Sequence, residues 1–235
     1  MPTTTSVELF RPDTPSPVRR GPALAAAVVG IIAVLTGTIA ILTLHLMSPT
    51  ALISPLRRTI SEYAYTTLGW VFNSGVVLIA AGSLLIAGSL WFSRSLPRLG
   101  AGTAAMLGWS ASLVVLVIFP KHNWSVGPAG HGTVHRIASL VAFVCVPIAA
   151  IALARRRTAP FTRTARLALM FAWISAGWLA TLMAAFIIGP FTGTPWWLVF
   201  PLGLMERGMA FFAILAVVGV GALAVRAARA PRLQP

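Results

Sequence analysis

Two of the four histidines in the chain stand four residues apart, at His131 and His135. On a helix this spacing places both rings on one face, where they could bind one metal ion such as zinc or flank one substrate group. A catalytic zinc ion usually has three protein ligands, and the spacing links only two. His122 or Glu62 could supply the third. The pair is therefore the candidate metal site, and a divalent metal is a candidate cofactor.

Only two acids lie outside the N-terminal tail, Glu62 and Glu206. In a partly dehydrated pocket the pKa of a carboxyl group rises toward neutrality, so that it can act as a general acid or base. Glu206 could instead form a structural ion pair with Arg207 or Arg136. We take Glu62, Glu206 and His122 as the candidates for catalysis.

Further polar and aromatic residues are candidates for contacts with a substrate. A serine beside an acid either caps a helix or orients a ligand. An asparagine near the start of an apolar segment either bonds a neighbouring helix or lines the floor of a pocket. Tryptophans within apolar segments pack in the core, and where several converge they suit a lipid or isoprenoid. These candidates for substrate binding are Ser61, Asn73, Trp109, Trp173 and Trp178.

Membrane-spanning helices must position all of these side chains. Of the 235 residues 57% are hydrophobic and 9% are charged, against about 25% charged in soluble domains. Six apolar segments reach the roughly 20 residues that a membrane helix needs. They are residues 22–47, 68–92, 99–119, 133–154, 165–188 and 197–225. We expect an all-α integral membrane bundle of six transmembrane helices over residues 21–226, between a disordered tail (1–20) and a short basic tail (227–235).

The arginines predict the orientation of this bundle. Thirteen of the 18 Lys and Arg residues fall on the side of the tails and the even-numbered loops. Positive residues concentrate on the cytoplasmic side of membrane proteins, so we expect the N-terminus and the C-terminus to be cytoplasmic. Arg57 and Arg58, in the first loop, are exceptions. The thirteen are Arg11, Arg19, Arg20, Arg94, Arg98, Arg155, Arg156, Arg157, Arg163, Arg166, Arg226, Arg229 and Arg232.

Three parts of the chain resemble one family. They are ISEYAYTTLGWVFNSG from residue 60, VIFPKHN followed by HGTVHRIASLVAF, and GLMERGMAFF from residue 203. They are similar to domain of unknown function family 998 (DUF998), a group of bacterial and archaeal multi-pass membrane proteins. The resemblance implies the fold, a cell-membrane location and the choice of site, but no reaction. In that family an aspartate commonly follows the Phe-Pro pair, whereas here Lys121 and His122 follow it.

Several functions remain open at this point. The first is a membrane-embedded enzyme acting on a lipid or isoprenoid-like substrate at the outer leaflet, either a metal-assisted hydrolase or an acid-initiated cyclase. The alternatives are a transporter, a haem or quinone protein that uses His45 and His135, and a noncatalytic scaffold. No charge lies near the middle of a span, which disfavours ion-coupled transport. Because the arginines act as topology signals, we expect the lipid bilayer and no nucleic acid as partner. The oligomeric state is left open.

Overall fold

The computed structural model describes residues 20–93, 100–122, 130–155, 162–193 and 200–229, and these residues form helices and connections without a strand. By length and composition, six of the described helices can cross a membrane. The expected all-α transmembrane bundle is confirmed. The six helices are α1 (Arg20–Thr43), α2 (Gly69–Phe92), α3 (Ala101–Ile118), α4 (Gly130–Arg155), α5 (Arg163–Ile188) and α7 (Leu202–Arg229). The short 3-10 helices are η2 (Thr50–Leu52), η3 (Ile60–Tyr65) and η4 (Gly189–Phe191).

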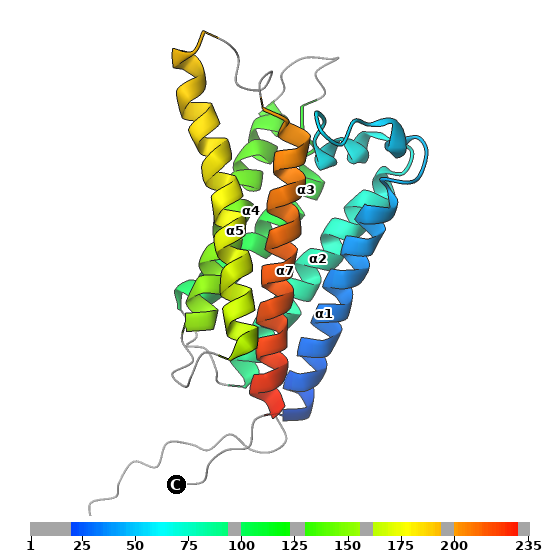
Figure 1. Ribbon diagram of the computed structural model, residues 1–235. Coiled ribbons are helices and arrows are strands. Elements are labelled where there is room, and N and C mark those ends of the chain that lie inside the picture. The colour runs from blue at the N-terminus through cyan, green and yellow to red at the C-terminus, as the bar shows by residue number, and fades with distance from the viewer. Residues whose placement is uncertain (1–19, 94–99, 123–129, 156–161, 194–199, 230–235) are drawn as a thin grey trace, which may run out of the picture.

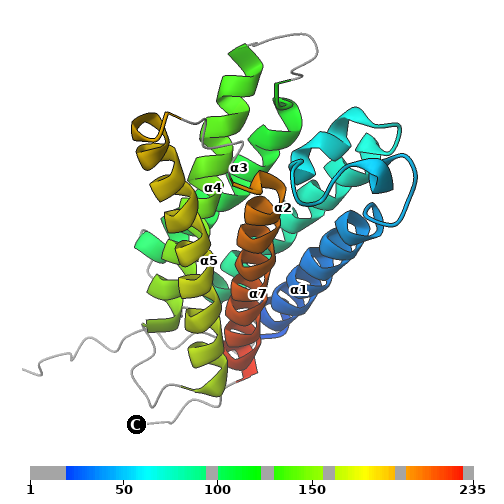
Figure 2. The same cartoon turned by 45° about the horizontal axis from the view of Figure 1, so that its top comes forward.

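Helix α7 runs through the middle of the bundle and packs against α1, α2, α4 and α5 (Figure 1). The start of α1 and the end of α7 lie at the same end of the bundle in both views (Figures 1 and 2). The connection between α1 and α2, residues 44–68, lies at the opposite end and contains η2 and η3. We call this connection the loop cap, and the end that carries it the capped end.

Helices α1 and α2 approach each other closely because glycines face one another at two levels. A Cβ atom added at Gly82 would lie 2.5 Å from the carbonyl oxygen of Gly30. A Cβ atom at Gly75 would lie 2.9 Å from the carbonyl oxygen of Gly37. Small residues at such crossings let two backbones pack directly, which is how apolar helices associate in a membrane. This contact fixes the helix pair that the loop cap connects.

The observed helix ends differ from the predicted ones mainly at the capped end. Helix α1 ends at Thr43 rather than Met47, because the chain turns there and the Thr50 hydroxyl donates to the carbonyl of Met47 (2.7 Å). Helix α4 begins at Gly130, before the predicted residue 133. Helix α7 continues to Arg229, past the predicted boundary at 226. The predicted tails at 1–19 and 230–235 lie outside the described residues.

Candidate functional site at the capped end

The acid of α7 fastens the loop cap to the bundle. One carboxylate oxygen of Glu206 accepts a hydrogen bond from the backbone N–H of Ile60 (2.5 Å), and the other accepts one from the hydroxyl of Ser61 (3.0 Å). Two of the sequence candidates, Glu206 and Ser61, are thus brought together from positions far apart in the chain. The alternative interpretation expected an ion pair of Glu206 with Arg207 or Arg136. Among the described residues Glu206 forms no such pair. It holds loop backbone instead.

The neighbouring Arg207 binds the same loop. Its guanidinium donates to backbone and side-chain acceptors, all but one of them in the loop cap, so that one side chain gathers them. The acceptors are the carbonyls of Pro55 (2.9 Å), Arg58 (2.7 Å) and Gly203 (3.0 Å), the hydroxyl of Tyr63 (3.0 Å) and Nε2 of His45 (3.0 Å). At Gly203 a Cβ atom would lie 2.6 Å from the carbonyl oxygen of Pro55. The loop backbone therefore rests directly on the start of α7.

His45 is a neutral acceptor in this network. Its Nδ1 bonds the carbonyl of Ile41 (3.2 Å) and must carry the proton, so Nε2 is free to accept from Arg207. The ring also meets the edge of Tyr63, with centroids 5.3 Å apart. Burial and the charge of Arg207 lower the pKa of His45. Both ring nitrogens are thus engaged, and a haem would have to displace Arg207 to bind there.

Glu62 lies at the centre of a charged cluster with Lys121 and Arg58. Its Oε1 accepts from Nζ of Lys121 (2.7 Å) and its Oε2 from Nε of Arg58 (2.5 Å). The side chains of Glu62 and Lys121 are 11% and 16% exposed, whereas that of Arg58 is 59% exposed. Burial alone would raise the pKa of Glu62, but the hydrogen bonds and charges of Lys121 and Arg58 outweigh it and hold the pKa below its ordinary value. Glu62 is therefore a carboxylate.

Tyr65 joins this cluster to the segment that precedes α4. Its hydroxyl donates to the backbone carbonyl of Lys121. The pKa of Tyr65 is raised by burial and by the negative charge of Glu62, so the phenol stays protonated. The same segment thus supplies a cation to Glu62 and an acceptor to Tyr65, which ties it to the loop cap at two points.

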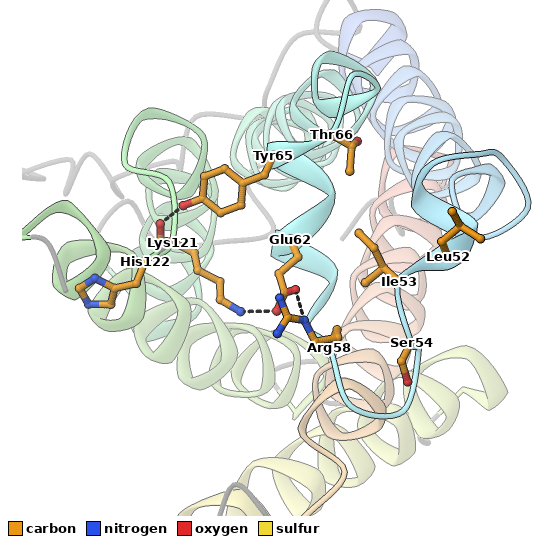
Figure 3. A pocket seen from close by; sticks show the side chains of 9 residues that line it. All are labelled: Leu52, Ile53, Ser54, Arg58, Glu62, Tyr65, Thr66, Lys121 and His122. Atoms are coloured by element: carbon orange, nitrogen blue, oxygen red, sulfur yellow. Dashed lines mark hydrogen bonds and ion pairs between the residues drawn. The ribbon is translucent and has the colours of Figure 1, made fainter. Parts of the chain in front are cut away.

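A cavity of about 480 Å³ opens beside this cluster (Figure 3). Lys121 and Arg58 point toward Glu62, Leu52 and Ile53 lie on the opposite side, and the ring of His122 is turned away from the ion pairs. The cavity has one charged wall and one apolar wall. Its lining residues are Leu52, Ile53, Ser54, Arg58, Glu62, Tyr65, Thr66, Lys121 and His122.

The start of α4 packs against His122, which lines the cavity, and carries His131 and His135, which do not. The ring of His122 lies on Gly132, where a Cβ atom would be 2.5 Å from Nδ1 of His122. Burial, and after it the charges of Arg136, His131 and Lys121, lower the pKa of His122. His135 is 6% exposed, whereas His131 is exposed to solvent. The two histidines of the predicted metal pair therefore share a helix but differ in surroundings.

His135 has one engaged and one open ring nitrogen. Nδ1 bonds the backbone carbonyl of Phe119 (2.9 Å), so it carries the proton. Nε2 is buried and has no hydrogen-bond partner among the described residues. A backbone carbonyl on one nitrogen commonly orients the other toward a metal or a proton. However, the described residues contain no group of three or more His, Cys, Asp or Glu placed to hold a metal ion.

The predicted aromatic and amide contacts are spread over the bundle. Trp109 is 3% exposed and donates its indole N–H to Ser83 (3.1 Å) in the core. Trp173 is 56% exposed, and Trp178 packs on Gly208 of α7. Asn73 is half-buried on α2. These four residues are not among those that line the described cavity, so a substrate contact for them stays a prediction.

The comparisons with known proteins bear on the family. The family model "Protein of unknown function (DUF998)" matches residues 28–226. The chain belongs to this family. The match begins within α1, ends within α7 and includes every residue that lines the cavity, so the DUF998 region contains the candidate site. No curated protein and no solved structure matches the chain.

Sequence reasoning missed the roles of Arg58, Lys121, Tyr65 and Arg207. One signal for them was present. The first loop carries two arginines against the pattern of the other clusters, and Arg58 is one of them. In the structure the ion pair with Glu62 gives Arg58 a local partner.

Proposed function

We propose that this DUF998 protein is a membrane-embedded enzyme that acts on a lipid or isoprenoid-like substrate in the cavity at the capped end. The observation that carries the proposal is the pairing of an apolar wall, with Leu52 and Ile53, and a charged wall, with Glu62 and Lys121, in one cavity of about 480 Å³. Small-molecule sites commonly occupy about 300–1,000 Å³. A substrate with an apolar chain and a polar head would satisfy both walls.

The proposal also places the capped end at the outer leaflet. Arginines lie at the far ends of the helices, among them Arg20, Arg155, Arg163 and Arg229. Cations of this kind favour the cytoplasmic side. The substrate would then be a lipid of the outer leaflet that enters from the membrane–water boundary.

Of the two reactions considered, hydrolysis has the better support. A cyclisation started by acid needs a protonated carboxyl beside the substrate, but Glu62 is held as a carboxylate and Glu206 is not among the residues that line the cavity. Hydrolysis needs a base, and Nε2 of His135, which has no hydrogen-bond partner among the described residues, is the candidate, although it is buried and His135 does not line the cavity. In this role Nε2 would take a proton from a water molecule as its oxygen attacks the scissile centre, and the leaving group would receive that proton.

The metal-assisted form of this reaction would use the same nitrogen. A divalent metal such as zinc would bind Nε2 of His135, with His131 or His122 as the second nitrogen ligand, and would lower the pKa of bound water. Metal content of purified wild type is to be compared with that of a double variant, His131→Ala and His135→Ala. Metal in wild type and its loss in the variant support this form. Equal content in both proteins rejects it.

Turnover of defined lipids tests the proposal itself. Purified protein is incubated with phospholipids, ceramides and isoprenyl phosphates, and products are identified by mass spectrometry. We expect one class to be consumed and His135→Ala to reduce the rate by about 100-fold or more, as for loss of a general base. Val134→Ala, an exposed change on the same helix, is the matched control and should retain the rate. No turnover of any class by wild type counts against an enzyme of this kind.

Absence of turnover would leave a scaffold and a transporter as the alternatives, and other readouts separate these two. A scaffold would show no turnover, and alanine at Glu62, Glu206, His131 and His135 would leave its cellular role intact. A transporter would move a substrate without changing it. The described spans carry no charge near their middle, which gives ion-coupled transport little support.

A further inference from the structure

The charged cluster in the cavity has an excess of hydrogen-bond donors. Glu62 accepts from Lys121, from Arg58 and, at 3.4 Å, from the hydroxyl of Thr59. A carboxylate offers roughly four acceptor positions, so this carboxylate has about one left. The acid of the cluster is close to saturated, and it has little capacity to bind a further cation or donor.

Both cations of the cluster keep unused donors. Arg58 uses Nε for Glu62, and its two Nη groups bond to no described residue. Lys121 gives two of its three N–H groups to Thr59 and Glu62. The hydroxyl of Ser54 also donates to no described residue, and it lines the same cavity. The unused hydrogen-bonding positions of this cluster are therefore nearly all donors. The cluster has two cations and one carboxylate, so its net charge is one positive unit.

The site is built rather than being a chance surface cluster. The side chains of Glu62 and Lys121 are almost buried, and Tyr65 holds the backbone of Lys121. Arg207 holds the backbone carbonyl of Arg58. Both cations are thus fixed through their main chains, while the guanidinium of Arg58 stays 59% exposed and free to meet a ligand.

The surroundings of the cavity indicate where such a ligand comes from. Leu52 lines the cavity and is 82% exposed, and Leu46, just beyond the end of span α1, is 86% exposed. Exposed leucines close to the end of a transmembrane helix are suited to the boundary between hydrocarbon and head groups. The head group of an anionic lipid lies at this boundary and can reach the cavity.

We infer that the cavity binds the phosphate group of an anionic lipid, with Arg58 and Lys121 as its donors and the lipid chain leaving past Leu52. Planar guanidinium groups bind phosphate oxygens in pairs, and an ammonium adds a point charge. The inference rests on the cavity of the proposed function and names the class of its substrate. It requires no chemical step, so binding alone can test it.

Native mass spectrometry of the detergent-solubilised full chain measures this binding. Phosphatidic acid and an isoprenyl monophosphate are titrated beside diacylglycerol and a prenol, which have the same chains without phosphate. We expect the phosphate lipids to bind wild type at least about tenfold more tightly, as for one to two charge-assisted hydrogen bonds. Arg58→Gln should lose most of that preference, and Arg58→Lys should keep part of it.

Arg57→Gln is the matched control, because it removes the same charge from the adjacent exposed residue that does not line the cavity. Equal losses in Arg57→Gln and Arg58→Gln would overturn the inference, since they indicate general surface charge. Equal binding of the neutral lipids would also overturn it. Inorganic phosphate that competes at a concentration similar to that of the lipids would indicate a free phosphate ligand and reject the lipid.

The two proposals can fail separately. If phosphate lipids bind through Arg58 but none is turned over, the inferred phosphate binding is supported and the proposed enzyme function is rejected. If a neutral lipid is turned over and Arg58→Gln leaves its turnover unchanged, the enzyme function is supported and the inferred phosphate binding is rejected.

Discussion

Gly132 is a glycine because an imidazole ring lies on it. A Cβ atom there would be 2.5 Å from Nδ1 and 2.7 Å from Cδ2 of His122. We expect Gly132→Ala to push this ring away and to destabilise the protein by about 1–3 kcal/mol, as in other overpacked sites. Thermal unfolding in detergent measures the change. Gly177→Ala, where nothing lies within 4 Å, is the control and should change stability by no more than about 1 kcal/mol. Equal unfolding temperatures for both variants would contradict this packing.

The hydrogen bond from Arg207 to His45 makes stability depend on pH. Burial and the charge of Arg207 lower the folded pKa of His45 below its ordinary 6.5, so the unfolded chain takes up a proton first as the pH falls. The stabilisation is complete above pH 6.5 and is lost as the pH drops through the folded pKa. Arg207 and the ring of Tyr63 face the imidazole.

The test compares unfolding temperatures of wild type and His45→Gln between pH 7.5 and 5. A glutamine can accept from Arg207 without titrating, so the variant should lose less stability on acidification. His122, whose pKa is lowered as well, leaves a slope of the same sign in both proteins. Parallel curves for the two proteins would show that His45 does not carry the dependence.

At the scale of single residues the sequence predicted the helix that carries the histidine pair but few of the contacts. The spacing of His131 and His135 placed both on a helix, and the structure confirms the helix. Their unlike burial depends on the segment that carries His122, which no spacing within the helix reveals. Glu206 likewise looked like half of an ion pair, because its real partners, Ile60 and Ser61, are about 145 residues away.

At the scale of elements, the six spans were predictable and the loop cap was not. An apolar segment of sufficient length must form a helix in lipid, since its backbone has no other partners there. The loop cap has no such constraint. Its shape is set by bonds to α7, such as those of Glu206 and Arg207, so its fold depends on a helix that comes last in the chain.

The attachment of the loop cap to α7 can be tested by proteolysis. Glu206→Ala would leave the N–H of Ile60 and the hydroxyl of Ser61 without their acceptor, a loss of about 1–3 kcal/mol. We expect the loop cap to open more often and trypsin to cleave after Arg57 or Arg58 about tenfold faster. Mass spectrometry of the N-terminal fragment measures the rate. Ser61→Ala, which removes one of the two bonds, should show a smaller increase. Cleavage of Glu206→Ala at the wild-type rate would mean that other contacts hold the loop.

At the scale of the whole molecule, the bundle separates two kinds of surface. The end that holds the start of α1 and the end of α7 is rich in arginine, while the capped end holds the charged cluster, the cavity and the histidines. Because an even number of spans returns the chain to its starting side, one orientation decides which leaflet the cavity faces. The arginine pattern favours the outer leaflet for the cavity.

Cysteine labelling in intact cells tests this orientation. The chain has one cysteine, Cys145, which Cys145→Ala removes. In that background Arg57→Cys places a thiol on the exposed loop cap, and Arg163→Cys places one at the start of α5, at the opposite end. A membrane-impermeant maleimide should label Arg57→Cys in intact cells and Arg163→Cys only after lysis. Labelling of both variants after lysis is the control, because it shows that both thiols can react. The reverse pattern would place the cavity on the cytoplasmic side, and its lipid would then have to come from the inner leaflet.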